Sequence, residues 1–262
     1  MHSLGVLALA MAAGMGNQPA TLPAASAGTR TLPRTTSRWS ATWQSGVTQG
    51  MQLSLGAMFN EGPAQQNRLT VSRSGFLRTG DSLQFYGWST TDLPTAYTDF
   101  ETGVRYRAPL RRFAGGKFIG GGGLEYWNFP SVLKGTRDVT LDSYLAWAGG
   151  GEKFPIVISG NGKTLLRSDL PKGTFACFQA IHTQKLWTIR DVRFALQHGP
   201  AYIYSWHLYG RDGHRVLRYY GTVTMNKGRW GIEAMFRPQV GLQPHIIDNK
   251  YWSFSFIRRF GV

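Results

Sequence analysis

Ser205 and His207 are the two residues of this chain whose types and spacing could support nucleophilic catalysis. They lie two positions apart in Tyr-Ser-Trp-His-Leu-Tyr, so on a strand both side chains would face the same side. A serine hydroxyl beside a histidine base can act as a nucleophile. The mechanism also needs a third polar group to orient the histidine, and the sequence identifies none. We therefore expect two polar residues without a catalytic role and no enzymatic activity.

A second group of chemically capable residues is charged and lies on one face of the segment Phe100–Ala108. Glu101, Arg105 and Arg107 alternate with a largely apolar opposite face that includes Val104. A face with a carboxylate and two guanidiniums is costly to bury in a dry core. The simplest arrangement places water on the charged side of the strand and lipid on the other side.

Further charged residues fall on the faces of other expected strands. Acidic and basic side chains that meet inside a pore form salt bridges and set its charge selectivity. The predicted pore-lining or ligand-binding residues are Glu101, Arg105, Arg107, Glu125, Asp142, Glu233 and Arg237. The histidines are too scattered for a zinc site, and the glycine runs do not open a helix. No metal or cofactor site is expected.

The elements that must position these residues are strands, because apolar and polar residues alternate with a period of two along most of the chain. The final segment, Tyr251–Phe260, places Trp252, Phe254 and Phe256 on one face and serines on the other. Thirteen such segments are recognisable, and closed single-chain bacterial barrels use an even number. We expect twelve strands. Either Leu186–Tyr209 forms fewer barrel strands than its pattern suggests, or Phe154–Arg167 lies outside the wall. Fourteen strands would follow if Gly160–Gly162 is a hairpin turn.

Composition favours the same class of protein. Charged residues make up 16% of the chain and aromatic residues 13%, with 33 glycines, which suits a barrel whose outer band touches lipid. The net charge of +15 indicates an anionic partner, but the basic residues are spread along the chain, so nucleic acid is not expected. Cys177 is expected to pack as a small apolar residue. Tryptophans that could form interfacial girdles are Trp88, Trp127, Trp147, Trp206, Trp230 and Trp252.

The N-terminal region reads as an export signal. Leu4–Ala13 is an apolar run of the length found in signal peptides, and Ala25-Ser26-Ala27 offers a cleavage site. A segment rich in proline, serine, threonine and alanine follows. The expected division is a signal peptide over 1–27, a linker or N-terminal segment over 28–45, and a barrel domain over 46–262.

The segment Arg68–Trp88 resembles the second and third strands of the nucleoside-specific outer-membrane channels, the Tsx-like barrels. It carries an alternating strand pair that ends in the aromatic-rich stretch Phe85–Trp88, and Tyr97–Arg107 and Tyr251–Phe260 resemble that family's fourth and last strands. The resemblance implies a twelve-stranded barrel with a narrow channel. The chain departs from the family in its strong basicity and in ending Phe260-Gly261-Val262. No family binding residue matches a position here.

The sequence therefore predicts an all-β fold, a closed antiparallel up-and-down transmembrane barrel in the bacterial outer membrane. Its expected function is a narrow channel or binding lumen for small polar solutes, anions and nucleoside-like molecules included. The expected partners are outer-membrane lipid and lipopolysaccharide, the small solute, and the barrel-assembly machinery through Tyr251–Phe260. The alternatives are an outer-membrane lipid-modifying enzyme that uses Ser205 and His207, and a soluble secreted β-barrel binder of an acidic ligand.

Overall fold

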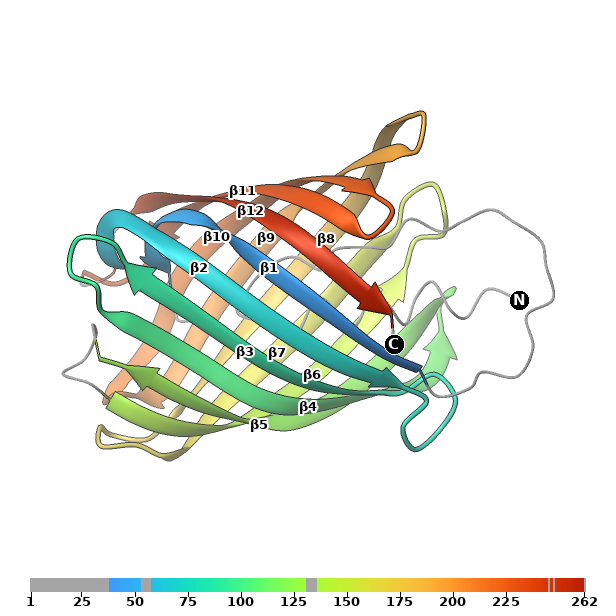
Figure 1. The fold of residues 1–262 in the computed structure, drawn as a ribbon. Coiled ribbons are helices and arrows are strands. Elements are labelled where there is room, and N and C mark those ends of the chain that lie inside the picture. The colour runs from blue at the N-terminus through green and yellow to red at the C-terminus, as the bar shows by residue number, and fades with distance from the viewer. Residues whose placement is uncertain (1–37, 53–57, 131–135, 245, 247, 262) are drawn as a thin grey trace.

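The fold is a single closed antiparallel sheet (Figure 1). The structure is a computed structural model and describes residues 38–52, 58–130, 136–244, 246 and 248–261. Each strand pairs with its neighbours in sequence, and β1 closes the ring by pairing with β12. The predicted all-β, up-and-down barrel of twelve strands is confirmed. In the part of the chain that the structure describes, no helix has both the length and the apolar character needed to cross a bilayer.

The strands are long and follow one another through short connections. Their bounds are β1 Arg38–Gln52, β2 Met58–Ser74, β3 Ser82–Asp92, β4 Thr98–Phe113, β5 Gly116–Phe129, β6 Thr136–Gly149, β7 Ile156–Arg167, β8 Thr174–Ile189, β9 Val192–Leu208, β10 Arg211–Lys227, β11 Trp230–Gly241 and β12 Asn249–Gly261. The barrel closes in regular register from Ser40 opposite Gly261 to Thr48 opposite Ser253. Closure leaves no open sheet edge along these residues, which is the condition for a sheet to stand in hydrocarbon.

The structure shows how many strands form in the two regions where the sequence pattern was ambiguous. The three expected segments between Phe175 and Tyr209 form only two strands, β8 and β9, which turn at Arg190–Asp191. Arg190 adopts a positive φ of 55° there, a conformation that the sequence does not signal for arginine. Gly199-Pro200 usually marks a turn, yet both residues pair with β10 inside β9. The strand β7 runs through Gly160–Gly162 without a break, so the fourteen-stranded alternative is wrong.

The predicted start of the barrel at residue 46 is also wrong, because β1 already begins at Arg38. Trp39, Trp43 and Val47 are exposed on its outer side, whereas Thr48 is buried. Apolar and polar residues alternate over Met51–Phe59 and predict one strand there, but the structure has the end of β1 and the start of β2 instead, with residues 53–57 outside the described part. The expected signal peptide over 1–27 also lies outside the described residues.

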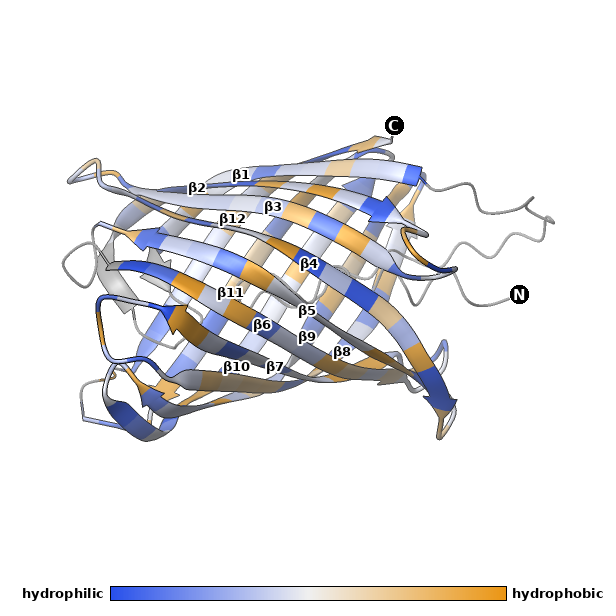
Figure 2. Cartoon of the chain, turned by 90° about the horizontal axis from the view of Figure 1, so that it is seen from below, coloured by the Kyte–Doolittle hydropathy of each residue, from blue (hydrophilic) through white to orange (hydrophobic). Residues whose placement is uncertain are grey.

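The outer surface of the barrel is apolar. Phe85, Leu124 and Leu141, which are 45%, 49% and 45% exposed, form one outward row across β3, β5 and β6, with Val104 of β4 between the first two. Figure 2 shows the resulting alternation of hydrophobic and hydrophilic residues along the strands. A water-soluble protein rarely exposes so much contiguous apolar surface. Large apolar side chains outside and polar ones inside are the pattern of outer-membrane β-barrels.

The tryptophans divide between the two sides of the wall. Trp206, Trp230 and Trp252 point outward, each 46% exposed, as interfacial girdles require. Trp127 instead lies inside the barrel with 1% exposure, so its expected place in a girdle is wrong. It packs near Phe129 and Phe175, whose ring centroids lie 5.7 and 6.3 Å from its own.

Candidate functional site in the barrel interior

The interior has an apolar part and a charged part. The apolar part is a cluster that includes Trp127, Phe129, Phe175, Ile203 and Leu208. Phe129 ends β5, Phe175 lies at the start of β8 and Leu208 ends β9, so the cluster lies near the end of the barrel opposite the start of β1 and the end of β12. Cys177 belongs to this cluster and is 3% exposed, so its expected role as a packed residue is confirmed.

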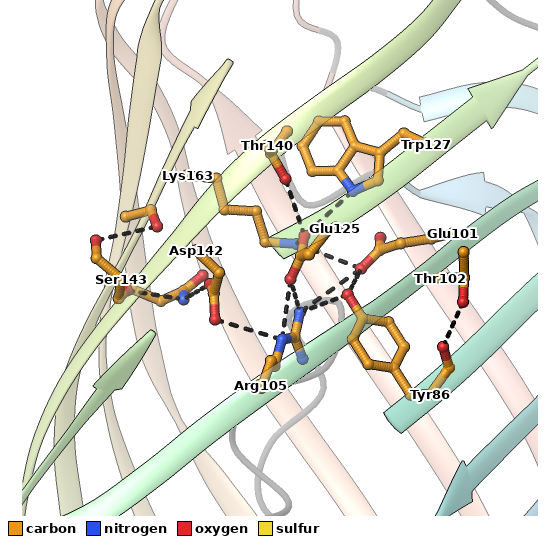
Figure 3. Close-up of polar contacts among 12 residues, drawn as sticks. Tyr86, Glu101, Thr102, Arg105, Glu125, Trp127, Thr140, Asp142, Ser143 and Lys163 are labelled. Atoms are coloured by element: carbon orange, nitrogen blue, oxygen red, sulfur yellow. Dashed lines mark hydrogen bonds and ion pairs between the residues drawn. The ribbon is translucent and has the colours of Figure 1, made fainter. Parts of the chain in front are cut away.

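The charged part lies near the middle of the strands and contains an ion-pair network of six residues, which Figure 3 shows without Arg107. Its members, here called the charge layer, are Glu101, Arg105, Arg107, Glu125, Asp142 and Lys163. Each is at most 5% exposed. Five of the six were predicted as interior residues from strand alternation, and the structure places all five inside the barrel.

Arg105 is the central cation of the charge layer. Its Nε donates to Oε1 of Glu125 at 2.9 Å, and its Nη2 also contacts that oxygen. The same guanidinium lies 3.3 Å from Oδ2 of Asp142 and 3.6 Å from Oε1 of Glu101. Asp142 also pairs with Arg107, with 3.5 Å between Oδ2 and Nη2. The predicted salt bridges among these residues are confirmed.

Lys163 of β7 is the member of the layer that sequence reasoning missed. Its Nζ lies 2.5 Å from Oε2 of Glu125 and 3.4 Å from Oε1 of Glu101. The nitrogen also lies 4.9 Å from the ring centroid of Trp127. The signal for Lys163 was its alternation with Ser159 and Leu165, both inward and buried, but the glycines in β7 made that strand look broken.

Two tyrosines shield the arginines of the charge layer. The hydroxyl of Tyr86 donates to Oε1 of Glu101 at 2.7 Å and accepts from Nη2 of Arg105 at 3.0 Å. Cζ of Arg105 lies 4.3 Å from the centroid of the Tyr86 ring, and Cζ of Arg107 lies 3.4 Å from that of Tyr144. Ring faces stabilise the cations that the carboxylates only partly neutralise.

Glycines in the wall make room for this network. A Cβ on Gly103 would lie 2.9 Å from Cε1 of Tyr86 and 3.1 Å from Cγ of Glu125. A Cβ on Gly123 would lie 2.9 Å from Cγ of Arg105. Real Cβ atoms essentially never come within 2.9 Å of a neighbour, and 3.1 Å is tighter than most real contacts, so the two glycines let large side chains lie flat against the wall.

Glu233 and Arg237, the remaining predicted interior residues, are buried inside the barrel on β11 but do not join the charge layer. Glu233 accepts a hydrogen bond from Nε2 of Gln44 at 3.1 Å and lies within electrostatic range of Arg68. Arg237 lies against the rings of Tyr220 and Tyr251. Among the described residues, the two are not ion-paired with each other, so that expected contact is wrong.

The charges near the middle of the barrel do not cancel. The cationic side chains there are Arg68, Arg105, Arg107, Lys163, Arg218 and Arg237, and the carboxylates are Glu101, Glu125, Asp142 and Glu233. Six cations against four carboxylates leave a surplus of two positive charges. Such an interior attracts small anions and repels small cations.

Ser205 and His207 are not arranged as a catalytic pair. A bulge at Trp206 breaks the alternation of β9, because Phe175 pairs with Ser205 while the preceding Thr174 pairs with His207. Ser205 is fully buried and donates to the carbonyl of Arg211 at 3.2 Å. His207 has a positive φ of 51° and an exposed side chain whose Nδ1 lies 2.6 Å from Asp212. The expectation that both residues share one face is wrong.

Comparison with known proteins gives matches to solved structures only. No family model matches the chain, and no curated protein matches it. An outer membrane channel from Pseudomonas putida F1 is similar at 12% identity over 91% of this chain and all of that chain, with a TM-score of 0.49. The β domain of the Bordetella autotransporter BrkA is similar at 10% identity over 86% and 98%, with a TM-score of 0.46.

A third solved structure, the translocator domain of the autotransporter NalP from Neisseria meningitidis, is similar at 13% identity. The match covers 86% of this chain and 87% of that chain, with a TM-score of 0.43. At these values, the fold assignment rests on the strand pairing and on the apolar surface of the chain itself.

Proposed function

We propose that this chain is an outer-membrane barrel whose interior passes or binds small polar solutes, with a preference for anions. The observation that carries the proposal is the reversed polarity of the fold. Apolar side chains cover the outside, while the charged side chains near the middle of the interior carry a surplus of positive charge. A charged interior is expensive unless it meets water or a charged solute.

The outer surface supports a place among lipids of the bacterial outer membrane, with lipopolysaccharide as the outer neighbour. The start of β1 and the end of β12 lie at one end of the barrel, where three connections are two residues long: 114–115, 190–191 and 228–229. At the other end, one connection, 209–210, is as short. Short turns face the periplasm in such barrels, so this end is the periplasmic one in our proposal. The last strand, with Trp252, Phe254 and Phe256 outward and Ser253 and Ser255 inward, would be the segment read by the assembly machinery.

A nucleoside-like solute is the narrower form of the proposal. Its support is the resemblance of Arg68–Trp88 to the nucleoside-specific channels. The surplus positive charge favours solutes that carry a negative group over neutral nucleosides. Uptake of a nucleoside and of its monophosphate by vesicles containing the barrel separates these two forms.

The enzyme alternative has less support. The contact between Nδ1 of His207 and Oδ2 of Asp212 supplies the orienting acid that the sequence could not identify. The hydroxyl of Ser205, however, is buried and bonded to a backbone carbonyl, while the His207 side chain is exposed. A nucleophile must meet its base within hydrogen-bond reach. The soluble-binder alternative conflicts with the many large apolar side chains on the outside.

The test is ion selectivity in planar bilayers. Replacing both Arg105 and Arg107 by glutamate should move the reversal potential toward cation preference. The matched control replaces Arg111 and Arg112 by glutamate. These two residues lie exposed at the end of the same strand, so the reversal potential should shift much less. An unchanged reversal potential in the Arg105/Arg107 variant would overturn the proposal. Arg107→Gln, which leaves the Arg105 ion pairs in place, serves if the double variant does not assemble.

A further inference from the structure

Arg218 of β10 and Arg237 of β11 form a second cationic centre, separate from the charge layer. They lie on adjacent strands, with Arg218 directly opposite Gln239 in the register. Both are almost fully buried, with 3% and 2% exposure. Buried guanidiniums normally pair with carboxylates, because a desolvated charge without a counter-charge is costly.

Neither arginine of this pair has a carboxylate partner among the described residues. No carboxylate oxygen there lies within 4.0 Å of either guanidinium in an ion pair, and the Nε atom of each lacks a hydrogen-bond acceptor. Arg218 donates to neutral groups only, to Oε1 of Gln239 at 2.9 Å and to the hydroxyl of Tyr220 at 3.4 Å. Glu233, four residues before Arg237 on β11, accepts from Gln44 and acts on Arg237 only from beyond ion-pair distance.

Aromatic rings hold the guanidinium of Arg237 in place. Its Cζ lies 5.1 Å from the ring centroid of Tyr220 and 5.2 Å from that of Tyr251. Cζ of Arg218 lies 5.9 Å from the same Tyr220 ring. Ring faces orient a guanidinium without satisfying its N–H groups, so the donors stay available for an acceptor that carries charge.

We infer that Arg218 and Arg237 bind an oxyanion, a carboxylate or phosphate group of the solute. This inference rests on the proposed function and names the chemistry that the interior selects. Planar guanidiniums match the two-oxygen edge of carboxylates and phosphates, and such charge-assisted bonds are about twice as strong as neutral ones. The Gln239 amide oxygen already accepts from Arg218, so the oxyanion takes its place on that guanidinium. A neutral acceptor is thereby exchanged for a charged one.

The two interior centres would then have different roles. In the charge layer, three cations face three carboxylates, so it has little affinity left for a solute anion. The surplus of positive charge is concentrated at Arg218 and Arg237. A carboxylate or phosphate offers a separate oxygen to each of two parallel N–H groups of a guanidinium, whereas chloride offers one atom to both, so the site should prefer oxyanions at equal ionic strength.

The test is isothermal titration of the full-length barrel, refolded in detergent, with inorganic phosphate, acetate and chloride. We expect saturable heats for phosphate and acetate, none for chloride, and at least a tenfold loss of phosphate affinity in Arg218→Gln/Arg237→Gln. The matched control, Arg111→Gln/Arg229→Gln, removes two exposed arginines and should bind as the wild type does. Each variant is first checked for folding by its heat-dependent gel mobility. The single variants replace the double variant if it does not fold.

The outcomes separate this inference from the proposed function. Phosphate binding that is equal in the Arg218/Arg237 variant and the wild type, or heats that depend on ionic strength alone, would overturn the oxyanion site. Anion-selective conductance in the same preparation would then leave the channel proposal standing. Saturable binding without conductance would support the site and refute the channel.

Discussion

Lys163 and Glu125 are ion-paired with 2.5 Å between Nζ and Oε2, although the whole of β6 lies between their strands. A pair that skips a strand ties three strands together from the inside. Glu125 at the same time receives Arg105 from the opposite side, so one carboxylate connects β4, β5 and β7. The charge layer therefore fixes the shape of this part of the wall as well as its charge.

Replacing Glu125 by glutamine should destabilise the barrel and raise its anion preference. The change leaves Arg105 and Lys163 buried with one shared carboxylate fewer, and breaking a buried pair typically costs about 3–5 kcal/mol. The measurements are the temperature at which the gel mobility of the folded barrel is lost and the reversal potential. Glu152→Gln, at an exposed turn, is the control and should change neither. A stable Glu125→Gln barrel would show that the layer does not hold the wall together.

An arginine at Val104 should impair membrane assembly. Val104 lies at the middle of β4 in the outward apolar row, beside Phe85 and Leu124. An arginine at mid-bilayer on the lipid face costs about 2–4 kcal/mol, and near the interface only about 0–1 kcal/mol. The control is Leu110→Arg, near the end of the same strand and next to Arg111. Assembly into lipid vesicles, followed by gel shift, measures both, and equal yields would contradict a lipid-facing row.

A methyl group at Gly103 should disturb the interior, whereas one at Gly87 should not. The Cβ of Gly103→Ala would meet Tyr86 at 2.9 Å and the backbone oxygen of Leu124 at 2.7 Å. A Cβ at Gly87, on the neighbouring strand, meets nothing within 4 Å. Overpacking of this kind typically costs about 1–3 kcal/mol. Urea denaturation of the refolded barrels compares the two variants, and equal midpoints would show that the wall adapts freely.

Acidification should weaken the connection between β2 and β3 through Asp81. Burial acts to raise the pKa of this carboxyl, but hydrogen bonds from the Tyr106 hydroxyl and from the amides of Leu77, Arg78 and Phe76 outweigh burial and hold the pKa below its ordinary value. Because the folded-state pKa is depressed, the carboxylate stabilises the fold above the unfolded-state value of about 3.9. That stabilisation is lost as the pH falls through the folded-state pKa.

Asp81→Asn should therefore lower the denaturation midpoint at neutral pH, and its difference from the wild type should shrink in acid. Removing one charged acceptor of several bonds costs about 1–3 kcal/mol. Asp169→Asn, at an exposed loop position, is the control. A difference that stays constant with pH would assign the effect of Asp81 to shape alone.

Much of the fold could be predicted because alternation is strict where each side of the wall meets a different medium. Glu101 and Arg105 were placed inside by their spacing from Val104 alone. β1 was missed, although Trp39, Trp43 and Val47 alternate with small polar residues, because its threonines and serines resemble a linker. The turn at Arg190–Asp191 could not be predicted, since an arginine with positive φ leaves no sequence signature.

The sequence predicted on which face of a strand each charged residue lies, but not which side chain it contacts. Spacing shows that Glu233 and Arg237 lie on the same side of β11, yet it does not show that Gln44 reaches one and two tyrosine rings hold the other. Contacts between distant strands depend on how the barrel closes. The bulge that separates Ser205 from His207 is likewise a property of the pairing with β8 rather than of the sequence around them.

The pairing of the first strand with the last makes the barrel indivisible. A chain that stops before β12 leaves two unpaired sheet edges, one on β1 and one on β11. Hydrocarbon cannot form hydrogen bonds with the amides and carbonyls of these edges, and each unsatisfied group costs several kcal/mol. Truncated products should therefore fail to insert and be degraded instead of forming smaller barrels. The barrel can close only after β12 has been synthesised, so the time needed to make this strand sets the earliest moment of insertion.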